Sequence, residues 1–232
     1  MSPNDLEQET RIARSYFSDF ADDYNSALDG RPARSLLHGI VNRLFRRNTL
    51  RARTRVVRDV LARYNIAGKT VLDLGCGPGE LAVIAAKMKA RVTGVDIVDE
   101  MIAIANSRAG RAGVADSVEF RVADLVAAPV DAADVTLLIG VIEYYGNLRP
   151  LLSKACRATR EVLIVADTRG PYWRRQLRYL LARIKRFRVY YHPPREVADL
   201  VGEQGFREKD HVVGHSFTVM VFERTGEASR DG

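Results

Sequence analysis

The sequence contains few cysteines and lacks a long apolar run. Its 232 residues include two cysteines, Cys76 and Cys156, too few for a disulfide framework and without the spacing of a metal-ligand pair. The longest apolar stretch, Val135 to Ile142, falls well short of the roughly 20 residues that a membrane helix needs. The first residues, MSPNDLEQET, lack the basic and then apolar layout of a signal peptide. We therefore expect a cytoplasmic protein without structural disulfides or membrane spans.

The rest of the composition is typical of a globular protein. Hydrophobic residues make up 47% and charged residues 28%, which argues against a disordered or fibrous chain. Because one domain typically has roughly 150 residues, the length predicts a single domain with an added helical part.

The net charge of +7 is distributed unevenly along the chain. Residues 31–69 contain eleven Arg or Lys and one acid, and residues 172–195 contain eight Arg or Lys and no acid. The remainder of the chain therefore carries a net charge of −11. Both basic segments have the periodicity of amphipathic helices. Each is either a solvated helix face or a surface for an anionic substrate, an anionic membrane or nucleic acid, and nucleic acid is the least favoured of these partners.

Between residues 66 and 170, short β-branched runs alternate with alanine-rich helical stretches, which is typical of βαβ units on a parallel sheet. The predicted strands span residues 70–74, 91–96, 118–122, 135–139, 162–166, 206–212 and 217–223. The predicted helices span residues 80–89, 100–109, 148–159 and 194–205. The predicted fold class is therefore α/β, with a doubly wound, mostly parallel seven-stranded sheet that ends on a hairpin-like pair.

The same pattern predicts how the chain is organised. Residues 1–65 are expected to form an N-terminal helical lid on the substrate side of the sheet. The core spans residues 66–224 and includes a basic helical insert at 171–191, after the fifth strand. Residues 225–232 are expected to form a disordered tail.

A glycine-rich turn follows the first predicted strand, in the sequence Val71-Leu-Asp-Leu-Gly-Cys-Gly-Pro-Gly79. Glycines let the backbone approach a ligand closely, and the N-terminus of the next helix favours a negative group. Asp73 precedes the turn, where a carboxylate can accept hydrogen bonds from a ligand amine. Asp96 ends the next strand, at the position that contacts ribose hydroxyls in doubly wound nucleotide sites. Asp124 follows a third strand and can accept from an adenine amino group.

Together these segments resemble the class I S-adenosylmethionine-dependent methyltransferases, in particular those that act on small molecules such as quinones and Mg-porphyrins. The resemblance implies a Rossmann-like fold, S-adenosylmethionine as cofactor, and a purine ring held between Ile97 and Leu125. It also places the backbone of Gly140 and Val141 against the cofactor. The expected cofactor-binding residues are Tyr24, Asp73, Gly75, Cys76, Gly77, Gly79, Asp96, Ile97, Met101, Ala123, Asp124, Leu125, Gly140 and Val141.

A nicotinamide dinucleotide site is the main alternative for the glycine turn. That site needs a third glycine at the position that Glu80 occupies here. Carboxylates at Glu80 and Asp73 would repel a pyrophosphate, so the sequence favours the methyltransferase interpretation.

Other aromatic and titratable residues are candidates for the reacting side of the site. The segment around Tyr16 and Tyr24 resembles the leading helix of small-molecule methyltransferases, where an aromatic face can contact the cationic sulfur. The expected catalytic residues are Glu143, Tyr144 and His192, which follow predicted strands or precede a proline pair. No metal site is expected.

The nature of the methyl acceptor is the least determined part of the interpretation. The Asn/Asp-Pro-Pro-aromatic run of nucleic-acid amino methyltransferases is missing after the fourth strand, and no cysteine is placed for cytosine-carbon chemistry. We therefore expect O- or N-methylation of a small biosynthetic intermediate. An RNA methyltransferase, an enzyme for a lipid-linked substrate at a membrane surface and a non-catalytic cofactor-binding module are the alternatives.

Overall fold

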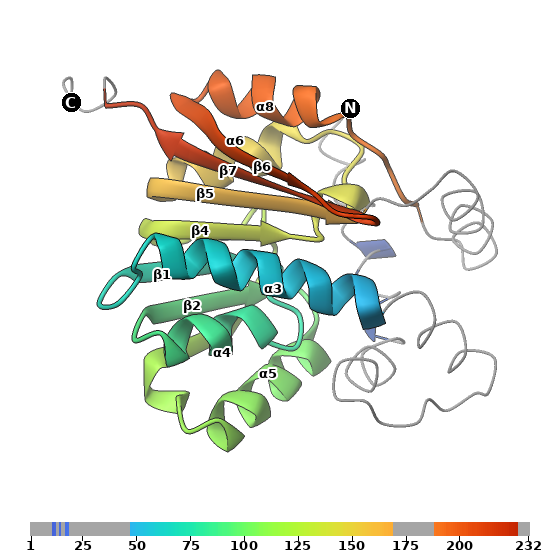
Figure 1. Ribbon diagram of the computed structural model, residues 1–232. Coiled ribbons are helices and arrows are strands. Elements are labelled where there is room, and N and C mark those ends of the chain that lie inside the picture. The colour runs from blue at the N-terminus through green and yellow to red at the C-terminus, as the bar shows by residue number, and fades with distance from the viewer. Residues whose placement is uncertain (1–10, 13, 15–16, 19–46, 169–187, 227–232) are drawn as a thin grey trace.

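The computed structural model describes residues 11–12, 14, 17–18, 47–168 and 188–226, and they build a seven-stranded sheet with helices on both faces (Figure 1). The strands are β1 Thr70–Leu74, β2 Arg91–Asp96, β3 Val118–Val122, β4 Ala133–Ile139, β5 Thr159–Thr168, β6 Phe206–Val213 and β7 Phe217–Arg224. Their spatial order is β3-β2-β1-β4-β5-β7-β6. The first five strands are parallel, and β7 runs antiparallel to both β5 and β6. The predicted fold class is confirmed.

Helices cover the sheet in two layers. The helices α3 Arg47–Arg63, α4 Glu80–Lys87 and α5 Asp99–Arg111 lie side by side on one face, and α6 Arg149–Arg157 and α8 Pro194–Gly202 lie on the other. Two short 3₁₀ helices, at Ala115–Ser117 and Ile142–Tyr144, precede β3 and follow β4. Each layer buries its own apolar cluster against the sheet.

The central strands are apolar because both of their faces are covered. All seven residues of β4 except Asp134 are buried, as are the last four residues of β1. At the edge, β3 alternates partly buried and exposed residues, and Val122 is 49% exposed. The run of apolar residues therefore marks the strands that lie at the centre of the sheet.

Three helices end earlier than the sequence predicts, and the first of them is α4, which is predicted to reach residue 89 and ends at Lys87. The helix predicted to reach residue 159 ends at Arg157, and Thr159 is already the first residue of β5. The helix predicted to reach Gly205 ends at Gly202, and Gly205, with a φ of 79°, makes the turn into β6. Thr159 therefore belongs to β5 and Gly205 to the turn before β6, and neither residue belongs to a helix.

Helix α3 packs with the core, although the sequence analysis groups its residues with the N-terminal lid. Val57, Val60 and Leu61 have no exposed surface, and the helix contacts β5, β7 and α4. At the other end of the chain, the backbone N–H and the hydroxyl of Thr225 both donate to the Gly205 carbonyl, at 2.9 Å. Thr225, which the sequence analysis places in the tail, is therefore bound to the core.

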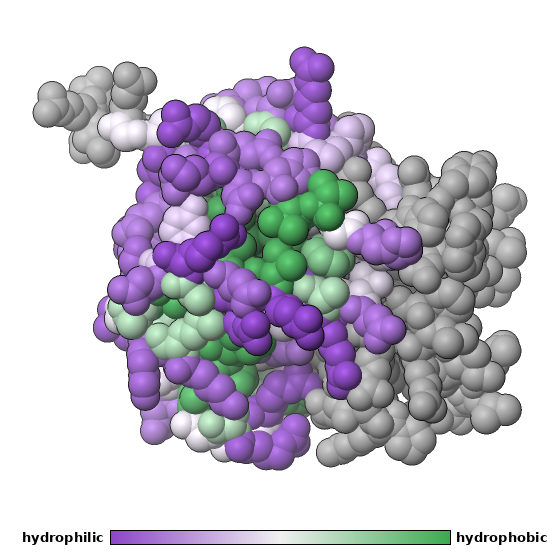
Figure 2. All heavy atoms as spheres, viewed as in Figure 1, coloured by the Kyte–Doolittle hydropathy of each residue, from purple (hydrophilic) through white to green (hydrophobic). Residues whose placement is uncertain are grey.

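The surface over α3 and α4 is mostly hydrophilic, and an apolar strip lies where α3 meets β6 and β7 (Figure 2). Among the described residues, no helix combines the length and hydropathy required to cross a membrane. Of the two basic segments, residues 31–46 and 172–187 lie outside the described residues, whereas residues 47–63 form α3. Of the predicted insert, residues 188–191 are described, and they are not helical.

Candidate functional site

The glycine turn between β1 and α4 is held tightly against its neighbours. Gly75 has a φ of 75°, and its N–H donates to the Val95 carbonyl at 2.8 Å. A Cβ on Gly75 would come within 2.4 Å of Val141 Cγ2, so a side chain is excluded at this position. A Cβ on Gly77 would meet nothing within 4 Å. The turn is therefore packed on one side and open to a ligand on the other.

Asp96, the last residue of β2, stabilises this turn through hydrogen bonds. Its Oδ2 accepts a hydrogen bond from the Gly77 N–H at 2.8 Å, and its Oδ1 accepts from the Val98 N–H at 3.0 Å. Burial raises the pKa of Asp96, and the backbone hydrogen bonds oppose that shift. Each carboxylate oxygen has two lone pairs, so the side chain has acceptor capacity left for hydroxyl groups.

Asp124 organises the loop after β3. Its Oδ1 accepts from the N–H groups of Val126 and Ala127, at 2.7 and 2.8 Å. The buried Lys154, on α6, donates from Nζ to the carbonyls of Val126 and Ala128 in the same loop. Leu125 is 6% exposed, and the backbone N–H of Ala123 donates to the Asp96 carbonyl. The loops after β2 and β3 are thus joined to each other.

Ile97, one of the two side chains expected to hold the purine ring, belongs to a second cluster, whereas Leu125 belongs to the larger cluster of the α6 and α8 face. Met101 and Val98 are buried, with Ile97 and Phe17 packed on them. Phe17 also makes an edge-on contact with Tyr144, with ring centroids 5.0 Å apart. Described residues of the N-terminal segment therefore lie over the carboxyl edge of the sheet, where Ser18 also donates to Glu100 at 2.7 Å.

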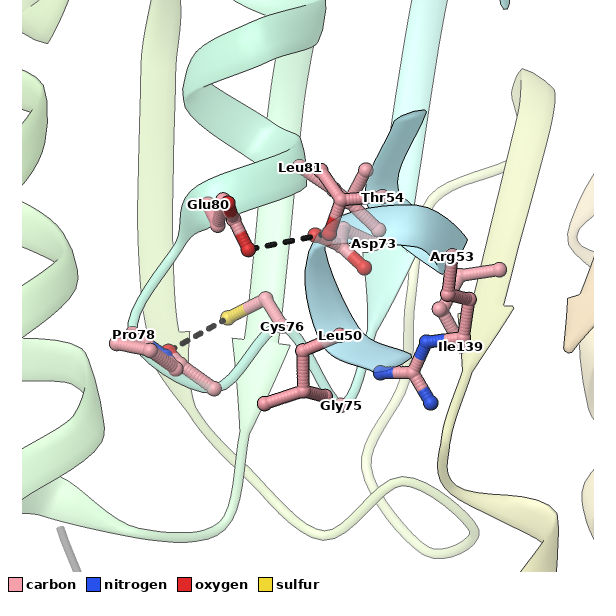
Figure 3. Close-up of a pocket in the computed structure, with 11 residues that line it drawn as sticks. Leu50, Arg53, Thr54, Asp73, Gly75, Cys76, Pro78, Glu80, Leu81 and Ile139 are labelled. Carbon is pink, nitrogen blue, oxygen red and sulfur yellow. Dashed lines mark hydrogen bonds between the residues drawn. The ribbon is translucent and has the colours of Figure 1, made fainter. Parts of the chain in front are cut away.

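A small pocket opens beside the glycine turn (Figure 3). Helix α3 contributes Arg53 and Thr54 to its wall, β1 contributes Asp73, and α4 contributes Glu80. Leu50, Gly75, Cys76, Gly77, Pro78, Leu81 and Ile139 complete the lining. Charged side chains thus face an otherwise apolar pocket.

Asp73 is the most buried acid of this pocket. It is 2% exposed, and its Oδ2 has no hydrogen-bond partner among the described residues. Burial, reinforced by the nearby charge of Asp96, raises its pKa from 3.8 to about 7, against a hydrogen bond from the Ala82 backbone and the charge of Arg53. A carboxylate of this kind is suited to pair with a cationic or hydrogen-donating ligand group.

Arg53 is a pocket residue that the sequence analysis does not identify. It is 7% exposed, its Nη1 donates to Thr168 Oγ1 at 3.1 Å, and its Nε has no partner among the described residues. The guanidinium lies over Gly140, where a Cβ would come within 2.5 Å of Nη1. Helical periodicity could have identified it, because Arg53 lies four residues before Val57 and thus on the apolar stripe of α3.

Glu80 occupies the position at which a dinucleotide site has its third glycine. Burial raises its pKa, and a hydrogen bond from Thr54 Oγ1 at 3.2 Å and the charge of Arg108 partly offset this effect. Cys76 is buried beside it, and its Sγ donates to the Gly77 carbonyl at 3.7 Å. Burial raises the pKa of this thiol well above its ordinary value, which disfavours the reactive thiolate, and a contact of Cys76 with the cofactor stays a prediction.

The candidate catalytic residue Glu143 lies after β4, at the same edge of the sheet. It is 3% exposed, its Oε2 accepts from the Thr168 N–H at 3.2 Å, and its carbonyl accepts from the Tyr190 N–H at 2.8 Å. Thr168 also binds Arg53, so these contacts connect the pocket to the loops that face the expected acceptor. Tyr144 is half-buried next to it.

The candidate catalytic residue His192 has partners on both ring nitrogens. Its Nε2 lies 2.8 Å from the Tyr145 carbonyl, and its Nδ1 lies 3.2 Å from Glu196 Oε2. Because a carbonyl oxygen only accepts, Nε2 carries the hydrogen. These contacts join the loop after β4 to the start of α8, and a catalytic role for His192 stays a prediction.

The structure gathers most of the expected site residues at one edge. The glycine turn, Asp73, Asp96, Asp124 and Gly140 all lie at or near the carboxyl ends of β1 to β4. Tyr16 and Tyr24 lie outside the described residues. Sequence order reverses between β1 and β4, and ligands of doubly wound sheets bind at such a switch point. Fold and site together define a Rossmann-like protein whose candidate site lies at the carboxyl edge of the sheet.

Comparison with known proteins gives the family. A family profile described as "Methyltransferase domain" matches residues 66–210, and the chain belongs to this family. The resemblance inferred from the sequence is confirmed at this level.

Individual relatives match parts of the chain. A ubiquinone biosynthesis O-methyltransferase from Methylobacterium sp. (strain 4-46) is 33% identical over 103 residues, which are 44% of this chain and 41% of the relative. A ribosomal protein L11 methyltransferase from Aeromonas hydrophila is 36% identical over 99 residues, or 38% of this chain and 34% of the relative. The chain therefore matches well under half the length of these relatives.

Solved structures share the fold over nearly the whole chain. The magnesium protoporphyrin IX methyltransferase from Synechocystis PCC 6803 with bound SAH superposes with a TM-score of 0.77 at 19% identity. The similarity covers 94% of this chain and 100% of that one.

Proposed function

We propose that this protein transfers a methyl group from S-adenosylmethionine to a small-molecule acceptor. The observation that carries the proposal is the set of acids Asp73, Asp96 and Asp124 at the ends of β1, β2 and β3, around an open glycine turn. Membership of the methyltransferase-domain family and the fold shared with a structure that binds SAH support it.

The residues present fit this cofactor. Asp96 has acceptor capacity for the two ribose hydroxyls, and in this proposal Asp124 accepts a hydrogen bond from the adenine amino group. The unpartnered Oδ2 of Asp73 suits the ammonium of the methionine end. A pyrophosphate would instead meet the buried carboxylates Asp73 and Glu80, which disfavours a dinucleotide.

When bound, the cofactor would supply a methyl group on a cationic sulfur, and the sulfur would leave on the side opposite the attacking acceptor. The protein contributes alignment and exclusion of water, since the positive charge disappears as the acceptor attacks. Glu143 takes up a proton where the acceptor loses one, and Tyr144 and His192 shape the acceptor side.

The acceptor in this proposal is a small planar or acidic molecule. The insert brings aromatic and basic residues close together in sequence, a combination suited to a conjugated or anionic ligand. Two similar proteins are named for ubiquinone and magnesium protoporphyrin, which are both conjugated ring compounds. Contact of the basic segments with an anionic membrane belongs to the same proposal.

Calorimetric titration with S-adenosylmethionine, S-adenosylhomocysteine and NAD⁺ tests the proposal directly. We expect both adenosyl ligands to bind with dissociation constants in or below the range of roughly 1 μM to 1 mM, and NAD⁺ not to bind. Incubation with methyl-labelled cofactor and a panel of phenols, quinols and carboxylic acids then identifies the acceptor by transfer of label. Binding of NAD⁺ alone would contradict the proposal.

A further inference from the structure

Resting on the proposed function, we infer that His192 is a positioning residue that, as a cationic imidazolium, holds the loop after β4 against the start of α8. This loop contains the 3₁₀ helix Ile142–Tyr144, which includes the expected catalytic residues Glu143 and Tyr144. His192 lies just before α8 and is 8% exposed. In this role it acts through its neighbours on the acceptor side of the site.

Both ring nitrogens of His192 face groups that only accept hydrogen bonds. Nε2 lies 2.8 Å from the Tyr145 carbonyl oxygen, and Nδ1 lies 3.2 Å from Glu196 Oε2. A neutral imidazole has one N–H and satisfies one such partner, whereas an imidazolium donates to both. The nearby carboxylate also stabilises the cation in its buried position. Each ring nitrogen of His192 therefore carries a proton.

The segment that contains His192 is attached to the loop after β4 at two alternate residues. The Tyr190 N–H donates to the Glu143 carbonyl at 2.8 Å, and the His192 ring donates to the Tyr145 carbonyl. These two carbonyls belong to the residues on either side of Tyr144. The backbone around Tyr144 is therefore held in one orientation.

Helix α8 is a firm support for this bridge. Val197 and Val201 have no exposed surface, and both belong to the apolar cluster on the α6 and α8 face of the sheet. Glu196 lies in the first turn of α8, and 42% of its side chain is exposed to water. His192 thus connects a helix that is packed in the core to the residues that face the expected acceptor.

NMR of the histidine rings tests the protonation of His192. In protein labelled with ¹⁵N in its four histidines, we expect both ring nitrogens of His192 to carry a proton at pH 7, and the His192→Gln variant identifies its signals. In Glu196→Gln the new amide can donate to Nδ1, so we expect this nitrogen to lose its proton. Asp199→Asn, at an exposed position of the same helix, is the control and should leave these signals unchanged. An unprotonated ring nitrogen in the wild-type protein overturns the inference.

Hydrogen exchange of the Tyr190 amide tests the positioning role. This N–H donates to the Glu143 carbonyl, so it exchanges faster when the loop after β4 moves away. In His192→Leu we expect its protection to fall about 10-fold or more, as for a lost hydrogen bond from a charged group. His192→Gln keeps a donor for the Tyr145 carbonyl and should recover part of the protection. The amide of the buried Leu137, in β4, should keep its protection in both variants. Equal losses at the two amides, or no loss at Tyr190, overturn the positioning role.

Binding of S-adenosylhomocysteine separates this role from the proposed function. In His192→Leu its affinity is expected to change less than about 3-fold, because His192 has its contacts on the acceptor side and not at the glycine turn. A larger loss would place His192 in the cofactor site and overturn the assigned role. If the unmodified protein does not bind S-adenosylhomocysteine, the proposed function fails, while the two NMR measurements still decide the role of His192.

Discussion

The three carboxylates of this site have different roles because their surroundings differ. Asp96 and Asp124 each accept two backbone N–H groups and so fix the loops that carry them. Asp73 has an unpartnered oxygen in a buried position. The sequence predicts all three from their place at strand ends, but their hydrogen bonds depend on loop conformation that no residue pattern specifies.

Replacement of Asp96 by alanine tests its place in the cofactor site. We expect the affinity for S-adenosylhomocysteine to fall by about 2 kcal/mol, roughly 30-fold, because two ribose hydroxyls lose a charged acceptor and Gly77 loses its anchor. Isothermal titration measures the change. Asp116→Ala, at an exposed position before β3, is the control and should bind normally. An unchanged affinity of Asp96→Ala would place the ribose elsewhere.

The raised pKa of Asp73 predicts how stability depends on pH. Its pKa is about 7 in the folded protein and near 3.8 when exposed, so between these values the folded state holds more protons than the unfolded state. The free energy of unfolding therefore falls as the pH rises from about 4 to 7, by an amount of the order of 4 kcal/mol for this group.

Urea unfolding of the wild-type protein and Asp73→Asn at pH 5, 6, 7 and 8 measures this contribution. Asparagine cannot titrate, so the variant should gain stability relative to the wild type as the pH rises. Other buried acids, such as Glu80, are present in both proteins and cancel in the comparison. A difference independent of pH would mean that Asp73 stays ionised in the folded protein.

At the scale of elements, much of the architecture is readable from the sequence. The bounds of β1, β2 and β3 agree with the predicted strands because each is a short β-branched run closed by turn residues or an acid. The position of β7 between β5 and β6 is not readable, since it depends on tertiary pairing. The sequence analysis does not identify Arg53, because the surrounding arginines suggest a solvated helix whereas Arg53 itself lies on the buried face of the helix.

Lys154 couples α6 to the loop that carries Asp124. In Lys154→Met we expect the carbonyls of Val126 and Ala128 to lose their charged donor, with a loss of unfolding free energy of about 1.5–3 kcal/mol. A several-fold weaker affinity for 5′-methylthioadenosine should accompany it, because the loop is expected to contact adenine. Lys87→Met, exposed on α4, is the control for urea unfolding and calorimetry. Loss of stability with unaltered affinity would show that the loop has no part in binding.

On the scale of the whole molecule, helical layers cover both faces of the sheet, and α3 buries Val57, Val60 and Leu61 in the same apolar cluster as α4. A ligand at the carboxyl edge touches loops after four neighbouring strands, so its binding energy is expected to stabilise the entire fold and not one part of it.

Thermal unfolding tests this expectation. At a concentration 100 times the dissociation constant, S-adenosylhomocysteine should add about 2.7 kcal/mol to the free energy of unfolding. For a chain of this size, the Tm should rise by roughly 5–10 °C in a single transition. NAD⁺ at the same concentration is the control and should leave the Tm unchanged. If two separate unfolding transitions appeared and S-adenosylhomocysteine raised the Tm of only one of them, the core would not be a single cooperative unit.

The antiparallel placement of β7 between β5 and β6 has a consequence for synthesis on the ribosome. Translation delivers β6 before the strand that will separate it from β5. The half of the sheet that carries the candidate site, β1 to β4, can fold as soon as it leaves the ribosome. Strand β6 has no strand to pair with until β7 has been synthesised. Nascent chains arrested ahead of residue 217 would therefore expose an unpaired β5 edge, the point at which a chaperone is most needed.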